Sequence, residues 1–211
     1  MRRVIIWRHG ETAQNAGGIY QGHLDTELSP RGEQQAAQAA QALAQRHPRR
    51  LLSSDLKRAV STAQALGLVS GLTPEMDPRW REIDVGQWQG MRHADVVAAH
   101  PEAMAALDRG EDVVRGVHGE SVADLQRRLR VVFDELVAEQ GPEETVVIAT
   151  HGLAGRALVA EVVGLSYQQA WLSLVGLRNC HWAELVEHRT GWRLEVWNAG
   201  VSESVGSVSD R

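Results

Sequence analysis

The sequence is poor in cysteine, lysine and long apolar runs. Cys180 is its only cysteine, which excludes an intramolecular disulfide and a zinc cluster built from cysteines. The apolar run at residues 4–7 is stopped by Arg8, and it is far shorter than a signal-peptide core or the ~20 apolar residues of a membrane-spanning helix. We therefore expect a cytoplasmic protein that has no membrane partner.

The charge balance is mildly acidic. The formal net charge is -5, and Lys57 is the one lysine among 22 basic residues. A general nucleic-acid binder needs a basic face, so we expect no nucleic-acid partner. The 211 residues, 43% of them hydrophobic, are enough for one sizeable core. We predict a single domain over residues 1–200.

Short apolar runs alternate with longer amphipathic segments along the chain. The runs at residues 4–7, 50–53 and 145–150 are typical of buried parallel strands. Helices are predicted at residues 31–46, from a cap at Ser54 or Asp55 to about 68, from Ser121 to about 140, at 152–163 and at 167–174. Residues 179–187 and 192–197 are predicted to form a hairpin at one sheet edge. The alternation predicts a three-layer α/β/α sandwich with a mostly parallel central sheet.

Two further segments stand apart from this alternation. Residues 79–90 contain two glycines and are predicted to form a loop, and short helices follow within residues 93–108. We interpret residues 91–120 as a small helical cap inserted into the domain. Residues 201–211 form a tail rich in Ser, Val and Gly, which is predicted to be flexible.

Two predicted strands end in a histidine. His9 follows the first strand, directly after Arg8, and His151 follows the strand at 145–150. Carboxyl ends of parallel strands meet at one sheet edge, where ligands bind, so we expect the histidines to lie together. Arg58, in the first turn of a helix, adds a second guanidinium. Arginine forks and helix N-termini suit a phosphoryl group and would repel a cation, which favours a phosphate site without a metal ion.

Several blocks of the sequence resemble, in order, the histidine phosphatase superfamily, which includes the phosphoglycerate mutases. They are Arg8-His9-Gly10-Glu11-Thr12, Asn15, Ser54-Asp55-Leu56-Lys57-Arg58-Ala59, Arg81-Glu82-Ile83-Asp84-Val85-Gly86-Gln87-Trp88-Gln89-Gly90 and His151-Gly152. The resemblance implies that His9 attacks phosphorus, that Glu82 protonates the leaving alkoxide, and that Arg8, Arg58 and His151 hold phosphoryl oxygens. It also places four residues at the phosphate, namely Asn15, Gln21, Gly22 and Gly152. No cofactor is implied.

The resemblance allows two enzyme activities, that of a phosphatase and that of a phosphoglycerate mutase. A mutase must shield its phosphohistidine from water. The segment between Glu82 and His151 is short for that task, contains no lysine and is rich in acidic residues, so hydrolysis of a small-molecule phosphate ester is favoured over a cofactor-dependent phosphoglycerate mutase. Loss of His9 or Glu82 would have favoured a non-catalytic phosphate-binding module, but both are present. Within the superfamily, residues 21–29 and 86–90 resemble the glucosyl-3-phosphoglycerate phosphatases and, more distantly, broad-specificity and α-ribazole phosphatases.

Other residues carry weaker expectations. Trp88 is predicted to fill the core, and His118 is a candidate for the mouth of the substrate pocket. His23 is expected to be an ordinary surface or packing residue. A homodimer would follow if the C-terminal hairpin exposed an edge strand with Trp182 or Trp197 on it.

Overall fold

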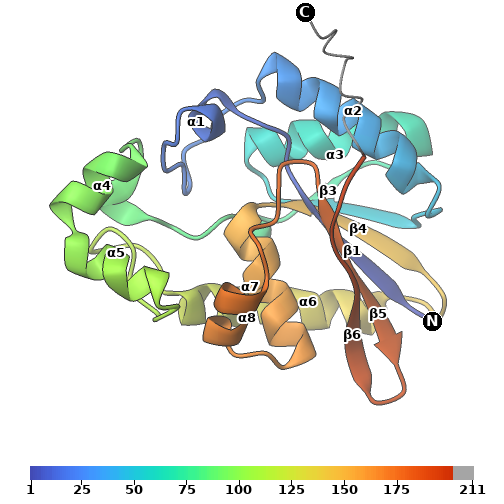
Figure 1. Ribbon diagram of the computed structural model, residues 1–211. Coiled ribbons are helices and arrows are strands. Elements are labelled where there is room, and N and C mark those ends of the chain that lie inside the picture. The colour runs from blue at the N-terminus through green and yellow to red at the C-terminus, as the bar shows by residue number, and fades with distance from the viewer. Residues whose placement is uncertain (202–211) are drawn as a thin grey trace, which may run out of the picture.

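A six-stranded mixed sheet with the order β3-β2-β4-β1-β5-β6 lies at the centre of the fold (Figure 1). The computed structural model describes residues 1–201. The strands are β1 (Arg3–Arg8), β2 (Arg50–Ser53), β3 (Glu75–Met76), β4 (Thr145–Thr150), β5 (Trp182–His188) and β6 (Gly191–Ala199). Strands β1 to β4 are parallel, whereas β5 and β6 form an antiparallel hairpin at one edge. The predicted strands and the edge hairpin are confirmed, and the short strand β3 was not predicted.

Helices cover both faces of this sheet. Helices α2 (Pro30–Ala44) and α3 (Lys57–Ser70) pack on one face, and α6 (Val122–Glu139) and α7 (Gly152–Val163) pack on the other (Figure 1). The alternation of side chains along β1 divides the core accordingly, because Ile5 belongs to the cluster beneath α2 and α3, while Ile6 belongs to the cluster beneath α6 and α7. The predicted three-layer sandwich is therefore confirmed.

The remaining helices are short. They are α1 (Ala13–Ala16), α4 (His93–Ala99), α5 (Pro101–Asp108), α8 (Tyr167–Ser173) and the 3-10 turns η1 (Pro78–Trp80) and η2 (Gly86–Trp88). Helices α4 and α5 lie in the predicted cap and extend to one side of the sheet, on the same side as α1 (Figure 1). The cap is packed into the main core through buried Val96, Met104 and Leu107. Trp88 is 2% exposed within that cluster, which confirms its predicted core position.

Two of the long helices begin as their sequences indicate. Ser29 accepts a hydrogen bond from the Gly32 N–H at 3.1 Å and Pro30 follows it as the first residue of α2. Ser121 and Asp124 form a capping box at the start of α6, which satisfies N–H groups that lack a partner within the helix.

Helix α3 begins differently from the prediction. Its N-cap is Leu56, not Ser54 or Asp55. The Asp55 carboxylate is instead paired with Arg81 at 2.6 Å, and the Lys57 N–H donates to the Asp25 carboxylate at 2.7 Å. The cap of this helix is thus supplied by a loop that is distant in sequence.

Two last points of the fold concern the C-terminal tail and membrane-spanning helices. The tail predicted to be flexible lies, from residue 202 onward, outside the described residues. Within residues 1–201, no helix is both long and apolar enough to cross a membrane.

Candidate active site

His9 and His151 meet at the carboxyl ends of the two central strands. His9 follows β1 and His151 follows β4, and the strands pair in parallel with Arg8 opposite Thr150. The His9 backbone N–H donates to the Thr150 carbonyl at 2.9 Å. The two imidazole rings lie edge to face with their centroids 5.2 Å apart. The parallel pairing therefore brings together two histidines that are far apart in sequence.

The loop that carries His9 is pressed against the first turn of α2. A Cβ atom on Gly10 would lie 2.4 Å from the carbonyl oxygen of Gly32, so neither position has room for a side chain. The Gly10 N–H donates to the Thr62 hydroxyl at 3.1 Å, and the Glu11 N–H donates to Gln35 at 3.0 Å. Glycine at position 10 thus allows α2 and α3 to fix the loop that carries His9.

The His9 ring is oriented by a single hydrogen bond. Its Nδ1 lies 2.7 Å from the Gly10 carbonyl oxygen. Because a carbonyl can only accept, the proton of the neutral ring sits on Nδ1 and the lone pair sits on Nε2. Burial, followed by the charges of Arg58 and Arg8, holds the pKa of His9 well below its ordinary value. His9 therefore presents a neutral, nucleophilic nitrogen at about pH 7.

His151 is completely buried beside His9. Its Nε2 lies 2.9 Å from the Ser54 hydroxyl oxygen, whereas its Nδ1 has no hydrogen-bond partner among residues 1–201. Burial first, and then the charge of Arg58, holds the pKa of His151 well below the usual value. A neutral His151 beside His9 avoids a repulsive pair of imidazolium ions.

Two arginines place guanidinium groups at the same edge. Arg58 is 1% exposed and donates to the carbonyls of Leu24 at 2.6 Å and Gly22 at 2.8 Å. Arg8 lies against Gly152, where an added Cβ would be 3.2 Å from the Arg8 Nε. Burial lowers the pKa of Arg58 to about 10 and also lowers that of Arg8. In the described chain, both Nε atoms are buried without a hydrogen-bond partner, so this edge of the sheet holds cationic donors suited to an anion.

Glu82 lies at the N-terminus of α7. One carboxylate oxygen accepts the N–H groups of Ile83 and Ala154 at 2.9 Å, and the other accepts the Leu153 N–H at 3.1 Å. A helix N-terminus stabilises negative charge, and these bonds orient the carboxylate. The negative charge of Glu82 also acts on both arginines, whose pKa values it raises against the effect of burial.

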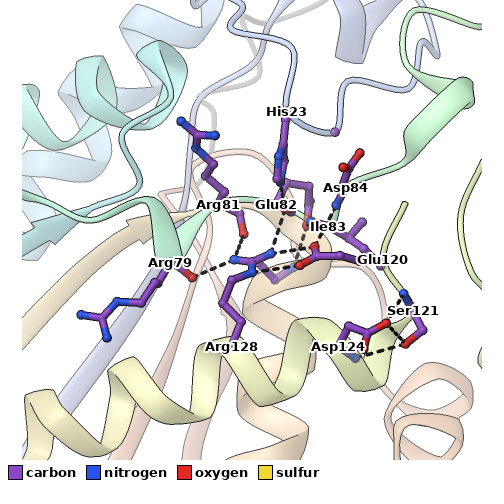
Figure 2. Close-up of polar contacts among 12 residues, drawn as sticks. His23, Arg79, Arg81, Glu82, Ile83, Asp84, Glu120, Ser121, Asp124 and Arg128 are labelled. Carbon is purple, nitrogen blue, oxygen red and sulfur yellow. Dashed lines mark hydrogen bonds and ion pairs between the residues drawn. The ribbon is translucent and has the colours of Figure 1, made fainter. Parts of the chain in front are cut away.

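Arg128 of α6 fixes the segment that carries Glu82 (Figure 2). Its guanidinium donates to three backbone carbonyls, those of Arg79, Arg81 and Glu82, at 2.8, 3.1 and 3.3 Å. It also pairs with the Glu120 carboxylate at 2.8 Å, and that carboxylate accepts the Asp84 N–H at 2.9 Å. Together Arg128 and Glu120, which we call the clamp, tie α6 and the end of the cap to the backbone around Glu82.

A cavity of about 220 Å³ opens beside His9. Seven of the nine residues predicted for the site line it: Arg8, His9, Asn15, Gln21, Gly22, Arg58 and Glu82. The other two lie behind this lining, because the His151 ring packs on His9 and Gly152 packs on Arg8. A larger hollow of about 460 Å³, beside Glu11 and Cys180, contains none of the nine, so the smaller cavity is the candidate active site.

Thr12 connects two of the polar residues of the lining. Its hydroxyl accepts the Asn15 N–H at 3.1 Å and donates to the Gln21 side-chain oxygen at 3.0 Å. Gln21 also accepts from the Thr26 hydroxyl at 2.6 Å. Asn15 and Gln21 are therefore held in place by hydrogen bonds before any ligand binds.

Several contacts of the site were missed from the sequence. His23, expected to be an ordinary residue, places its Nε2 2.8 Å from the Glu82 carbonyl oxygen. His118 is exposed and does not line the cavity, so its candidacy for the pocket mouth was wrong. The cap residues that line the cavity are instead Leu107 and Arg115. The one sequence signal of Arg115 is a charged side chain within the otherwise apolar run Val113-Val114-Arg115-Gly116-Val117.

Residues 1–201 contain no group of three or more His, Cys, Asp or Glu side chains arranged to hold a metal ion. Both histidines of the site lie beside arginines, and a cation is disfavoured there by charge repulsion.

Comparisons with known proteins agree on one family. The sequence model of the histidine phosphatase superfamily (branch 1) matches residues 4–200. A glucosyl-3-phosphoglycerate phosphatase of Mycolicibacterium vanbaalenii is 41% identical, over 94% of this chain and 95% of that protein. A probable phosphoglycerate mutase of Erwinia tasmaniensis is 32% identical, over 99% of this chain and 94% of that protein. A solved structure of a mycobacterial glucosyl-3-phosphoglycerate phosphatase in complex with VO3 superposes with a TM-score of 0.89 at 41% identity, over 95% of this chain and all of that one.

The α/β sandwich, the phosphate-type site and the relatives together define the class of the protein, which is that of a phosphatase acting on phosphate monoesters. More specifically, the chain belongs to the histidine phosphatase superfamily, branch 1. The family resemblance predicted from the sequence is thereby confirmed.

Proposed function

We propose that the protein hydrolyses a phosphate monoester of a small metabolite in two displacements, with His9 as the nucleophile. In the first step the His9 Nε2 lone pair forms a bond to phosphorus, the ester P–O bond breaks, and Glu82 gives its proton to the leaving oxygen. In the second step Glu82, now a carboxylate, takes a proton from a water molecule. The oxygen of that water attacks phosphorus, and the P–Nε2 bond breaks. The products are the alcohol and inorganic phosphate.

The observation that carries this proposal is the state of His9. Its hydrogen bond to Gly10 leaves Nε2 free, and its lowered pKa keeps the ring neutral. A neutral imidazole beside two guanidinium groups is poised to accept a phosphoryl group and not a proton.

The other site residues are proposed to bind and stabilise the phosphoryl group. Arg8 and Arg58 carry the positive charge, His151 is proposed to hold phosphoryl oxygens together with them, and the remaining contacts are proposed for Asn15, Gln21, Gly22 and Gly152. Positive groups fixed in advance stabilise charge on the transferring oxygens.

Hydrolysis is favoured over mutase chemistry by the charge of the cap. Glu102, Asp108, Glu111 and Asp112 are all exposed on it, and these acidic side chains would repel a doubly phosphorylated cofactor. One relative is named a probable phosphoglycerate mutase, so the mutase reaction is the alternative to be tested. A binding module without catalysis is disfavoured because His9 and Glu82 line the same cavity.

We propose glucosyl-3-phosphoglycerate as the natural substrate. This assignment rests on the relative of that name, which is 41% identical over nearly the whole chain. The cavity supports a sizeable leaving group, because Leu107 and Trp171 extend its lining beyond the polar residues around His9.

The test is phosphate release from a small panel of esters: p-nitrophenyl phosphate, 3-phosphoglycerate, glucosyl-3-phosphoglycerate and α-ribazole phosphate. We expect turnover of the aryl ester, the highest kcat/KM for glucosyl-3-phosphoglycerate, and no turnover by H9A. A coupled assay for conversion of 3-phosphoglycerate to 2-phosphoglycerate covers the alternative. Mutase activity that exceeds hydrolysis, or full activity in H9A, would overturn the proposal.

We further propose that the protein acts in the cytoplasm, which suits a single unpaired cysteine, and that it forms a homodimer. The support for a dimer is the open edge of β6, since unpaired strand edges invite pairing. The edge strand does not carry the exposed tryptophan that was expected. Trp182 is 6% exposed, and Trp197 is partly buried and donates to the Val175 carbonyl. Light scattering on the purified protein tests the dimer, and a monomer at all concentrations would contradict it.

A further inference from the structure

Arg115 is a buried cation in the wall of the active-site cavity. It comes from the cap and is 4% exposed. Its guanidinium donates to the Val113 carbonyl and, at 3.4 Å, to the Tyr167 hydroxyl. No carboxylate of the described chain forms an ion pair with it. The arginines of residues 1–201 that do form ion pairs lie mostly on the surface. A buried charge without a counter-charge is unfavourable, so this position calls for an explanation.

The backbone around Arg115 is locked to the Glu82 segment. The Gln87 N–H donates to the Gly116 carbonyl at 3.0 Å, and the Glu120 N–H donates to the Asp84 carbonyl at 2.9 Å. Gly116 has φ +52°, and a Cβ there would lie 2.0 Å from the Val85 carbonyl oxygen. Glycine is therefore required for this close approach. Arg115 is consequently held in a fixed relation to the acid of the site.

Arg115 occupies a different part of the cavity from the phosphate-binding arginines. Arg58 donates to the backbone carbonyls of Leu24 and Gly22, and Arg8 lies against Gly152. Arg115 instead comes from the cap and donates to the hydroxyl of Tyr167 in α8, where its charge opposes the increase in pKa that burial causes. The cavity thus has one cationic region at His9 and a second at the cap.

Apolar and aromatic groups occupy the wall near this second region. Tyr20, Leu107, Leu153 and Trp171 line the same cavity, and Arg156 stacks on the Trp171 ring at 4.0 Å. An organic group that follows the ester oxygen would pass these side chains to reach Arg115. A carboxylate on that group would accept hydrogen bonds from the guanidinium and neutralise it.

We infer that Arg115 recognises a carboxylate on the leaving group, and that the substrates are phosphate monoesters of hydroxy acids. This inference rests on the proposed phosphatase function and adds the residue and the chemical group that select the substrate. The glyceric acid part of glucosyl-3-phosphoglycerate is one member of the class. Esters of neutral alcohols, which leave Arg115 unpaired on binding, are poor substrates.

The test compares two esters that differ in the proposed group. In 3-phosphoglycerate a carboxylate stands where glycerol 3-phosphate has a hydroxymethyl group. We expect the wild type to prefer the carboxylate ester in kcat/KM by about 10- to 100-fold, the usual range for a hydrogen bond to a charged group. R115Q abolishes this preference, mainly through KM of the carboxylate ester, and R115K retains part of it. R109Q changes an exposed arginine of the same cap and keeps the wild-type preference.

The outcomes separate the two proposals. Turnover of both esters with equal kcat/KM in the wild type, or an unchanged preference in folded R115Q, overturns the role of Arg115 and leaves the phosphatase intact. If R115Q does not fold, inhibition of the wild type decides: glycerate must inhibit competitively where glycerol does not, and equal inhibition overturns the inference. Calorimetry of both esters with H9A gives the same decision without turnover, and absence of turnover in the wild type counts against the proposed function alone.

Discussion

Replacement of Glu82 by glutamine changes one carboxylate oxygen and so separates the structural work of this residue from its chemistry. The retained carbonyl oxygen can still accept from Ile83 and Ala154, but the new amide group faces the Leu153 N–H, which loses its acceptor. Loss of one charge-assisted hydrogen bond and of the anion at the α7 N-terminus lowers the free energy of unfolding by about 1–3 kcal/mol, because the site is partly solvated. For a chain of this size each kcal/mol lowers Tm by about 2–4 °C. E82Q should therefore be folded and measurably less stable.

The catalytic effect of E82Q depends on the leaving group. An alkoxide is a poor leaving group without a proton, so we expect the rate of His9 phosphorylation by alkyl esters to fall by about 10²- to 10⁴-fold. A nitrophenolate leaves without help, and its loss should be at least about tenfold smaller. The assay is the first-turnover rate with 3-phosphoglycerate and with p-nitrophenyl phosphate, together with thermal melts of both proteins. The first turnover is compared, and not kcat, because E82Q also slows the hydrolysis of phosphohistidine.

Asp124 offers the matched control, because its carboxylate also accepts a backbone N–H at a helix N-terminus but lies outside the cavity. D124N should lower stability and keep the wild-type ratio of alkyl to aryl turnover. Equal losses on both ester classes in E82Q, in the chemical step, would refute the acid role. A loss of Tm without any loss of alkyl turnover would make Glu82 a helix cap only.

Three further results are expected. The lowered pKa values of His9 and His151 mean that the unfolded chain binds more protons than the folded chain below about pH 6.5. As the pH is lowered through that range, the free energy of unfolding should therefore decrease by on the order of 1 kcal/mol per pH unit for each histidine. Urea titrations of the wild type and H151Q at about pH 7.5 and about pH 5.5 measure this decrease, and the same decrease in both proteins would contradict it. Activity should survive exhaustive treatment with a chelator, and restoration by added metal would refute the metal-free site. R128M should lower stability by about 2–3 kcal/mol, because Glu120 and three carbonyls lose their donor, with E120Q/R128M less affected than the sum of the single variants.

Much of the fold could be predicted from local sequence. Strands β1 and β4 are buried on both faces, so each is a continuous apolar run, and such runs are visible without knowledge of any partner. The pairing of His9 with His151 followed from a general rule, that parallel strands end at the same edge. Ser29 and Ser121 could be predicted as caps because each bonds within its own helix.

The remainder depended on contacts between distant segments. Ser54 and Asp55 looked like caps for α3, but His151 and Arg81 occupy their side chains, and no local pattern reveals such competition. The clamp formed by Arg128 and Glu120 reads in the sequence as two ordinary charges of α6 and the segment before it. Its function follows only from the path of the Glu82 segment, which passes within hydrogen-bonding distance of the Arg128 guanidinium (Figure 2).

The cap was the least predictable region for the same reason. His118 was a candidate because it lies just before a predicted helix in the cap, whereas the path of the loop decides which side chain points inward, and this side chain is that of Arg115. The φ of +52° at Gly116 and its contact with Val85 set that path, and they leave His118 exposed.

The central claim is that the phosphoryl group passes through His9. The most direct measurement is a rapid-quench experiment under neutral to alkaline conditions, with E82Q mixed with p-nitrophenyl phosphate and the bound phosphate mapped by peptide mass analysis. Because Glu82 is also needed to activate water, the variant should accumulate one phosphoryl group on His9, and H9A should carry none. Turnover without a phosphorylated protein, or phosphate found on His151, would contradict the account.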